Sequence, residues 1–97
     1  MTLDGFDDPM FAGLPQAADL RVYLEQGQHR NHFLTALLEN DLFEAVGRAD
    51  AANLAALAEY CSWLNTYAPR MAYGSRERVA AWIAHRGLSG LDQPGRD

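Results

Sequence analysis

The longest helical run in the sequence extends from Asp50 to Tyr67 and is apolar around most of its circumference. On a helical wheel one side carries Leu54, Leu57, Ala58, Cys61 and Leu64, and the adjoining side carries Ala56, Tyr60, Trp63 and Tyr67. The remaining polar stripe consists of Glu59, Ser62, Asn65 and Thr66. A helix that is apolar over so wide an arc is normally surrounded by other elements. The run therefore predicts an all-α domain built around a central buried helix at about 50–67.

The size of the chain allows one domain. Its 97 residues, of which 48% are hydrophobic, suffice for a single core. The sequence predicts a compact bundle of four to five short helices. The lone cysteine excludes an intrachain disulfide and fits a reducing, cytoplasmic setting. The first residues show no signal peptide, and no apolar stretch approaches the roughly 20 residues of a membrane span.

Charge is unevenly distributed along the chain. The net charge is −5, and all eight basic residues are arginine. Residues 1–66 hold three arginines against ten acidic residues, which gives −7, whereas residues 67–97 hold five against three, which gives +2. Because nonspecific nucleic-acid binding requires neutralisation of phosphates, the acidic balance argues against nucleic acid as the partner.

The N-terminal third contains one clear helix. Residues 1–13 lack helical periodicity and are expected to form a flexible N-terminal arm. The alternative is an acidic and aromatic segment, with Phe6 and Phe11, that docks on a partner or a second copy. A first helix is predicted from Pro15 to Gln26, because proline favours the first helical position.

Two further helices are predicted before the central run. Asn31 is expected to cap a mostly buried helix that ends at Asn40. The hydrophobic phase then changes, and Asp41 is expected to cap a short helix that reaches Arg48. The predicted inward-facing residues of this short helix are Leu42, Phe43 and Val46.

Asp50 is expected to cap the central helix, which should end before Pro69 because the residue preceding a proline disfavours the helical region. Ser75 is expected to cap a last helix that ends at Gly87. The residues predicted to be buried in it are Val79, Trp82 and Ile83. The helical domain thus covers residues 14–88, and residues 89–97 are expected to be a disordered tail.

No residue pattern points to catalysis, a metal or a cofactor. His29 and His32 lie three positions apart near Glu25, but zinc requires three or four ligands of this type. Cys61 lies between Leu57 and Leu64 and is expected in the core, not as a nucleophile. Nucleophile-elbow, dinucleotide-binding and phosphate-loop motifs are missing from the sequence. We therefore expect a protein that is not an enzyme.

The sequence contains two further groups of residues that could form a binding surface. Arginines gather at the last helix, and the alternative function is a small DNA-associated regulator that uses Arg70, Arg76 and Arg78. The aromatic residues Tyr60, Trp63, Tyr67, Tyr73 and Trp82 lie close together in sequence. Part of this aromatic surface could serve a partner or a homodimer.

About half of the chain resembles a group of small proteins carried by bacteriophages, prophages and plasmids. The matching segments keep their order and read FLTALLENDLFEAVGRAD from Phe33, WLNTYAP from Trp63 and YGSRERVAAWI from Tyr73. Members of that group often carry G-I-P-P-G before FLTA, where this chain has GQHRNH. The resemblance implies a mobile genetic element in a bacterial cytoplasm. It supplies no catalytic residues, because most members of the group have no assigned function.

Small acidic proteins of mobile elements often bind host proteins, and some block a defence complex such as a CRISPR effector. An acidic surface can compete for an arginine-rich channel through charge complementarity. The resemblance and the charge together predict a noncatalytic interaction protein, with anti-CRISPR-like inhibition as the specific form. The residues expected to bind the partner are Asp41, Glu44, Asp50 and Glu59, assisted by Asp7 and Asp8.

Overall fold

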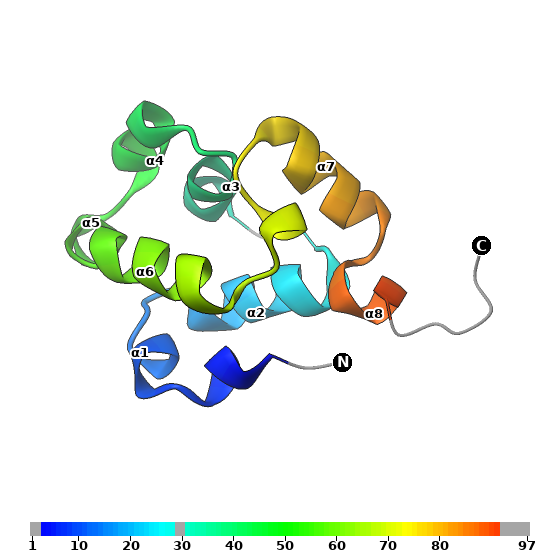
Figure 1. Cartoon of the computed structure of the whole chain (residues 1–97). Coiled ribbons are helices and arrows are strands. Elements are labelled where there is room, and N and C mark those ends of the chain that lie inside the picture. The colour runs from blue at the N-terminus through cyan, green and yellow to red at the C-terminus, as the bar shows by residue number, and fades with distance from the viewer. Residues whose placement is uncertain (1–2, 29–30, 92–97) are drawn as a thin grey trace.

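Helices form the whole of the regular structure in a computed structural model that describes residues 3–28 and 31–91 (Figure 1). The α-helices are α1 (Pro9–Ala12), α2 (Ala17–Gln26), α3 (His32–Leu38), α4 (Leu42–Arg48), α5 (Ala51–Ala55), α6 (Leu57–Tyr67), α7 (Arg76–Ala84) and α8 (Gly87–Leu91). Two 3₁₀ helices, η1 (Asp4–Asp7) and η2 (Arg70–Ala72), complete the described part. The all-α prediction is confirmed, although the helices are shorter and more numerous than expected.

Local capping chemistry explains where α3, α4, α5 and α7 begin. Asn31 Oδ1 accepts a hydrogen bond from the Leu34 N–H at 2.7 Å, and Asp50 Oδ1 accepts one from the Asn53 N–H at 2.8 Å. The predicted caps Asp41 and Ser75 likewise accept from the backbone three residues on. Each cap satisfies one of the backbone donors that a helix start leaves without an intrahelical partner.

The predicted central helix is divided into α5 and α6 at Ala56, whose φ of −94° and ψ of 6° leave the helical region. Asn53, which is buried beside the break, accepts a hydrogen bond from the Tyr60 hydroxyl at 2.7 Å. That hydroxyl in turn accepts one from the Gln16 N–H at 2.9 Å. This buried polar chain joins the start of α2 to α5 and α6, and the sequence did not predict it.

Only one side of α5 and α6 is covered by the fold. Tyr60, Trp63 and Leu64 are buried, as the core requires. On the opposite side Leu54 is 48% exposed and Cys61 is also exposed, so their predicted place in the core is wrong. The helix α4, whose apolar residues were expected to point inward, packs against α3.

The orientation of α4 is the largest departure from prediction. Its small residue Ala45 is fully buried, whereas Leu42, Phe43 and Val46 are 58%, 90% and 42% exposed. The expectation that these three residues point inward is therefore wrong. The turn before α4 determines its rotation, because Asn40 takes a left-handed φ of 65° and the Asp41 N–H bonds to the Ala36 carbonyl. This turn places Ala45 toward α3 and leaves the larger side chains outside.

Residues 4–12 form a clasp over α6. Within this N-terminal clasp, Phe6 and Phe11 are buried and their rings lie 5.9 Å and 4.8 Å from the Trp63 ring. The Trp63 indole N–H donates to the Gly5 carbonyl at 2.9 Å, and the Tyr67 hydroxyl donates to Asp8 Oδ2 at 2.6 Å. The expected flexible arm is thus wrong for the described residues, because helices of one turn are too short to show periodicity in a sequence.

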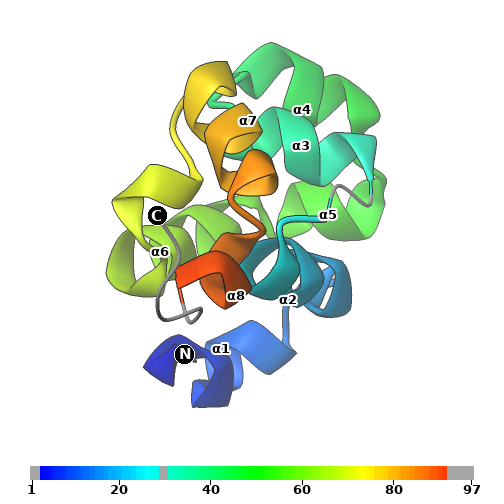
Figure 2. The same ribbon diagram turned by 90° about the vertical axis from the view of Figure 1, so that its right-hand side faces the viewer.

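The chain end from α7 to α8 returns to α2 (Figure 2). Trp82 is buried and its indole N–H donates to the Tyr23 carbonyl at 3.1 Å, while Leu88 is also buried. Val79 is buried as predicted, but Ile83 is only half-buried. Residues 89–91 belong to α8, so the tail prediction is wrong for them, and residues 92–97 lie outside the described residues.

The hydrogen bond between Tyr67 and Asp8 is expected to make the stability of the fold depend on pH. This bond, with the one from the Met10 N–H, lowers the pKa of the Asp8 carboxyl. A carboxyl whose folded pKa is lowered stabilises the fold above its unfolded pKa, and loses that contribution as pH falls through the folded pKa. We expect Tyr67→Phe to raise the Asp8 pKa toward its ordinary value in an NMR titration. Tyr73→Phe is the control because its hydroxyl donates to Asn65, and equal Asp8 titration in both variants would contradict the assignment.

Candidate protein-interaction site

A polar hollow of about 300 Å³ lies where α3, α4 and α7 meet. Its lining residues are His32, Thr35, Ala36, Glu39, Asp41, Glu44, Arg48 and Arg76. Three of these side chains are carboxylates, and two of the three, Asp41 and Glu44, were predicted as partner-binding residues. The hollow is therefore the place where the structure brings predicted binding residues together with further charges.

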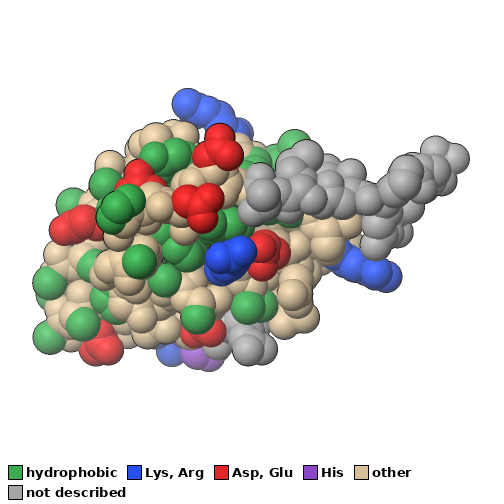
Figure 3. All heavy atoms as spheres, turned by 90° about the horizontal axis from the view of Figure 1, so that it is seen from below, with side chains coloured by type: hydrophobic (Ala, Val, Ile, Leu, Met, Phe, Trp, Pro, Cys, Tyr) green, Lys and Arg blue, Asp and Glu red, His purple; other side chains and the backbone are tan. Residues whose placement is uncertain are grey.

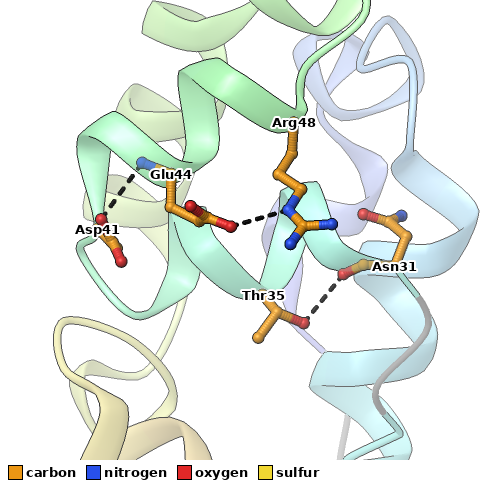
Figure 4. Close-up of polar contacts among 5 residues, drawn as sticks. All are labelled: Asn31, Thr35, Asp41, Glu44 and Arg48. Atoms are coloured by element: carbon orange, nitrogen blue, oxygen red, sulfur yellow. Dashed lines mark hydrogen bonds and ion pairs between the residues drawn. The ribbon is translucent and has the colours of Figure 1, made fainter.

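Glu44 and Arg48 form the middle of this site. The Arg48 Nε donates to Glu44 Oε2 at 2.8 Å, with both side chains about half exposed. Figure 4 shows the pair pointing toward each other over α3, with Asp41 at the start of α4. An exposed pair one helical turn apart contributes about 0.3–0.5 kcal/mol. A cationic side chain of a partner can therefore replace Arg48 at Glu44 with only a small loss of free energy.

The remaining charges of the hollow also belong to elements far apart in sequence. Glu39 at the end of α3 lies 3.8 Å from the Arg76 Nε, and Arg76 extends into solvent with its side chain 77% exposed. Thr35 also lines the hollow, and its hydroxyl donates to the Asn31 carbonyl at 2.9 Å (Figure 4). The floor of the hollow is thus built from α3, and its charged rim comes from α3, α4 and α7.

Asp50 lies in a second hollow on the other side of Arg48. This hollow measures about 340 Å³ and is lined by Gln16, Asn31, His32, Phe33, Arg48, Asp50 and Asn53. The charge of Asp50 reaches the buried polar chain as well. Burial is the main cause that raises the pKa of Tyr60, and Asp50 adds to it. The two hollows therefore adjoin, and both are lined by His32 and Arg48.

The acidic stretch 39–50 carries a net negative charge. It holds Glu39, Asp41, Glu44 and Asp50 against Arg48 alone, a net charge of −3. Asp41 and Asp50 each use Oδ1 to cap a helix, and a carboxylate has a second oxygen that can accept a bond from a cation. Capping and partner binding are therefore compatible at both residues.

The other predicted partner-binding residues lie elsewhere. Asp7 and Asp8 belong to the N-terminal clasp, and Glu59 is exposed on α6. Asp8 is also a helix cap, since it accepts from the Met10 N–H at 2.8 Å. Seen from below, acidic and hydrophobic side chains intermingle over the lower face of the protein (Figure 3). The structure thus separates the six predicted carboxylates into Asp41, Glu44 and Asp50 of the acidic stretch and the residues on the clasp and α6.

The arginines proposed for the alternative function have local contacts. Arg78 Nη1 donates to the carbonyls of Arg70 and Tyr73, both at 3.4 Å, and Arg76 pairs with Glu39. Glu77 lies with Arg70 and Arg78 around one shallow surface hollow. These contacts direct the arginines in different directions and place a carboxylate among them, which is unfavourable for following a phosphate backbone.

Metal and nucleophile chemistry find no support in the described residues. No group of three or more His, Cys, Asp or Glu side chains within residues 3–28 and 31–91 is placed to hold a metal ion. His29 lies outside the described residues, and His32 is exposed at the start of α3. Cys61 is exposed as a residue, but partial shielding raises the pKa of its thiol, and a protonated thiol is a poor nucleophile.

Comparison with known proteins identified no protein similar to this chain. The sequence matches no family model, and neither a curated protein nor a solved structure shows significant similarity to it. Within the described part of the chain, no helix combines the length and the apolar character needed to cross a membrane. The function has to be argued from the site itself.

Proposed function

We propose that this protein is a noncatalytic interaction protein that binds a basic surface of a protein partner. The observation that carries the proposal is the acidic stretch 39–50, where four carboxylates surround two adjoining hollows. Because charge complementarity steers association and selects partners, such a surface favours a partner rich in arginine and lysine. The resemblance to proteins of mobile elements makes a bacterial host or defence complex the partner class.

Inhibition is the specific form that we propose for this activity. A partner that binds nucleic acid presents arginine and lysine side chains along its channel, and phosphate contacts supply much of its affinity. The carboxylates of the acidic stretch would occupy some of those side chains and compete with the nucleic acid. The protein would then act as an anti-CRISPR-like or related inhibitor encoded by a mobile element.

The test uses substitutions that remove charge and keep the helix caps. Asparagine caps a helix about as well as aspartate, so Asp41→Asn and Asp50→Asn preserve the N-cap bonds. Combined with Glu44→Gln, they neutralise three carboxylates of the acidic stretch. We expect this triple variant to lose at least about 90% of a partner captured from nuclease-treated bacterial lysate, a tenfold change in binding.

The matched controls neutralise carboxylates outside the acidic stretch. Glu77→Gln on α7 is expected to retain the captured partner. The pair Asp7→Asn and Glu59→Gln measures whether the clasp and α6 contribute, as the sequence predicted. Capture that stays the same in the triple variant, with its helical circular dichroism intact, would remove the acidic stretch as the binding site. Capture that disappears after nuclease treatment would instead support a nucleic-acid-dependent role.

A further inference from the structure

The second hollow, which Asp50 lines, contains a buried amide that faces its open space. Asn53 lines this hollow and is only 4% exposed. Its Oδ1 accepts from the Tyr60 hydroxyl, whereas no hydrogen bond within the described residues uses its Nδ2. No buried side-chain nitrogen or oxygen in the described part of the chain lacks a partner, so this Nδ2 reaches the hollow. The buried polar chain therefore ends on a donor at the bottom of a cavity.

The same polar chain determines which side of the Asn53 amide faces the hollow. The Tyr60 hydroxyl accepts from the Gln16 N–H at 2.9 Å, so its own proton requires an acceptor. Burial raises the pKa of this hydroxyl, which keeps the proton in place at neutral pH. An amide turned the other way would bring a second donor to the hydroxyl and leave that proton without a partner. The oxygen of Asn53 therefore faces Tyr60, and the nitrogen faces the hollow.

Two more donors and one acceptor line this hollow. Gln16 accepts from Asn31 through its Oε1, which leaves its Nε2 as a donor. Arg48 uses its Nε toward Glu44, and Figure 4 shows the guanidinium between Glu44 and Asn31. Asp50 caps α5 through Oδ1, so its Oδ2 is the acceptor. With the buried amide, the hollow offers three kinds of N–H donor and one carboxylate oxygen.

This set of donors and acceptor favours a neutral ligand. An ion of either sign meets one favourable and one opposing charge, those of Asp50 and Arg48. A cation would in addition leave the Asn53 donor without an acceptor. A carboxamide is uncharged, and it carries an acceptor oxygen next to two N–H donors. The chemistry of the hollow therefore matches a carboxamide, and its volume of about 340 Å³ is large enough for one.

We propose that the hollow at Asp50 binds the carboxamide of a glutamine or asparagine that a protein partner presents beside its cationic side chains. The carboxamide oxygen accepts from Asn53 Nδ2, and the carboxamide nitrogen donates to Asp50 Oδ2. The partner's cations occupy the neighbouring hollow, where three carboxylates lie. This inference rests on the proposed function and adds selectivity to it, because a site built around hydrogen bonds rejects groups that cannot form them.

The test is an NMR titration of the isotopically labelled full chain with propionamide up to about 100 mM, a range suited to so small a probe. We expect a saturable shift of the side-chain amide signals of Asn53. Butanone replaces the nitrogen of propionamide by a methyl group, and propionate replaces it by an oxygen. Both are expected to bind at least about tenfold more weakly. A hollow that gives no saturable shift, or that binds all three probes equally, overturns the proposal.

Two substitutions change the groups that face the hollow and keep the contacts within the fold. Asp50→Asn still caps α5, and Gln16→Glu still has an oxygen to accept from Asn31. Each is expected to weaken propionamide binding at least about fivefold, because one removes the acceptor and the other a donor. Gln28→Glu is the control, since this exposed residue lies outside the hollow, and it should leave binding unchanged. Equal binding in all three variants would contradict the assigned contacts.

Gln16→Glu also separates this inference from the proposed function. The variant adds a negative charge, so attraction of a basic partner by charge alone would increase the amount captured from lysate. We expect capture to fall instead, because the partner's carboxamide loses a donor. Capture that rises while propionamide binding falls would assign the carboxamide to a free small molecule and overturn the role of the partner. Propionamide binding without any captured partner would remove the proposed function and leave the carboxamide site in place.

Discussion

Replacing Trp63 by alanine is expected to lower the free energy of unfolding by about 3–5 kcal/mol, the usual cost of deleting a buried tryptophan or phenylalanine side chain. Trp63 is fully buried and lies against both phenylalanines of the N-terminal clasp. It also donates to the Gly5 carbonyl, which would lose this partner. The whole clasp should therefore detach from α6. Urea denaturation followed by circular dichroism measures the change.

Two further substitutions serve as comparisons for the loss of stability in Trp63→Ala. Trp63→Phe keeps a ring in place but removes the indole N–H, and is expected to cost about 1–3 kcal/mol because a buried carbonyl loses its donor. Met71→Ala, at an exposed position, should change stability by no more than about 0.5 kcal/mol. If Trp63→Ala proved no more harmful than Met71→Ala, the clasp would contribute nothing to the fold.

Gly87→Ala is expected to destabilise the protein by about 2–4 kcal/mol, since strain at a left-handed residue and overpacking add together. Gly87 has a φ of 60°, and an added Cβ would lie 2.6 Å from the Leu24 carbonyl oxygen and 2.7 Å from the Gly27 backbone nitrogen. Both neighbours are backbone atoms of the α2 end, so they can move only if α2 and α8 separate. Thermal unfolding measures the loss.

Gly47→Ala is the matched substitution for Gly87→Ala, because it adds the same methyl group to a glycine with open space around it. Alanine is expected to stabilise α4 by up to about 1 kcal/mol. The two glycine substitutions should therefore change stability in opposite directions. Stability changes of the same sign and size would show that the close approach of α2 and α8 is not required for the fold.

The starts of α3, α4, α5 and α7 could be predicted because a capping residue acts within its own turn. The expected start at Pro15 is wrong, because α2 begins at Ala17 and has no side-chain cap. Asn31, Asp41, Asp50 and Ser75 each accept the expected backbone hydrogen bond. The rotation of a helix within the bundle depends on distant partners instead. The hydrophobic pattern of α4 identified an apolar face correctly, but no local signal showed that Ala45 would be the residue turned toward α3.

The same distinction applies to the candidate site. Asp41, Glu44 and Asp50 could be selected from the sequence by their charge. Their common neighbour Arg48, and the contributions of Glu39 and Arg76, depend on how α3, α4 and α7 pack. The buried pair of Asn53 and Tyr60 was also missed. An asparagine in an apolar helical run is a weak signal until the fold shows what it contacts.

The two tryptophans of the protein report on opposite parts of the fold. The Trp63 indole bonds to a carbonyl of the N-terminal clasp, and the Trp82 indole bonds to a carbonyl of α2 near α8. Intrinsic fluorescence of Trp63→Phe and Trp82→Phe variants should therefore resolve two separate environments without an attached dye. In the Trp82→Phe variant, emission from Trp63 would follow release of the N-terminal clasp. In the Trp63→Phe variant, emission from Trp82 would follow opening of the contact between α2 and α8. Stopped-flow measurements on the two variants would therefore distinguish stepwise from concerted unfolding.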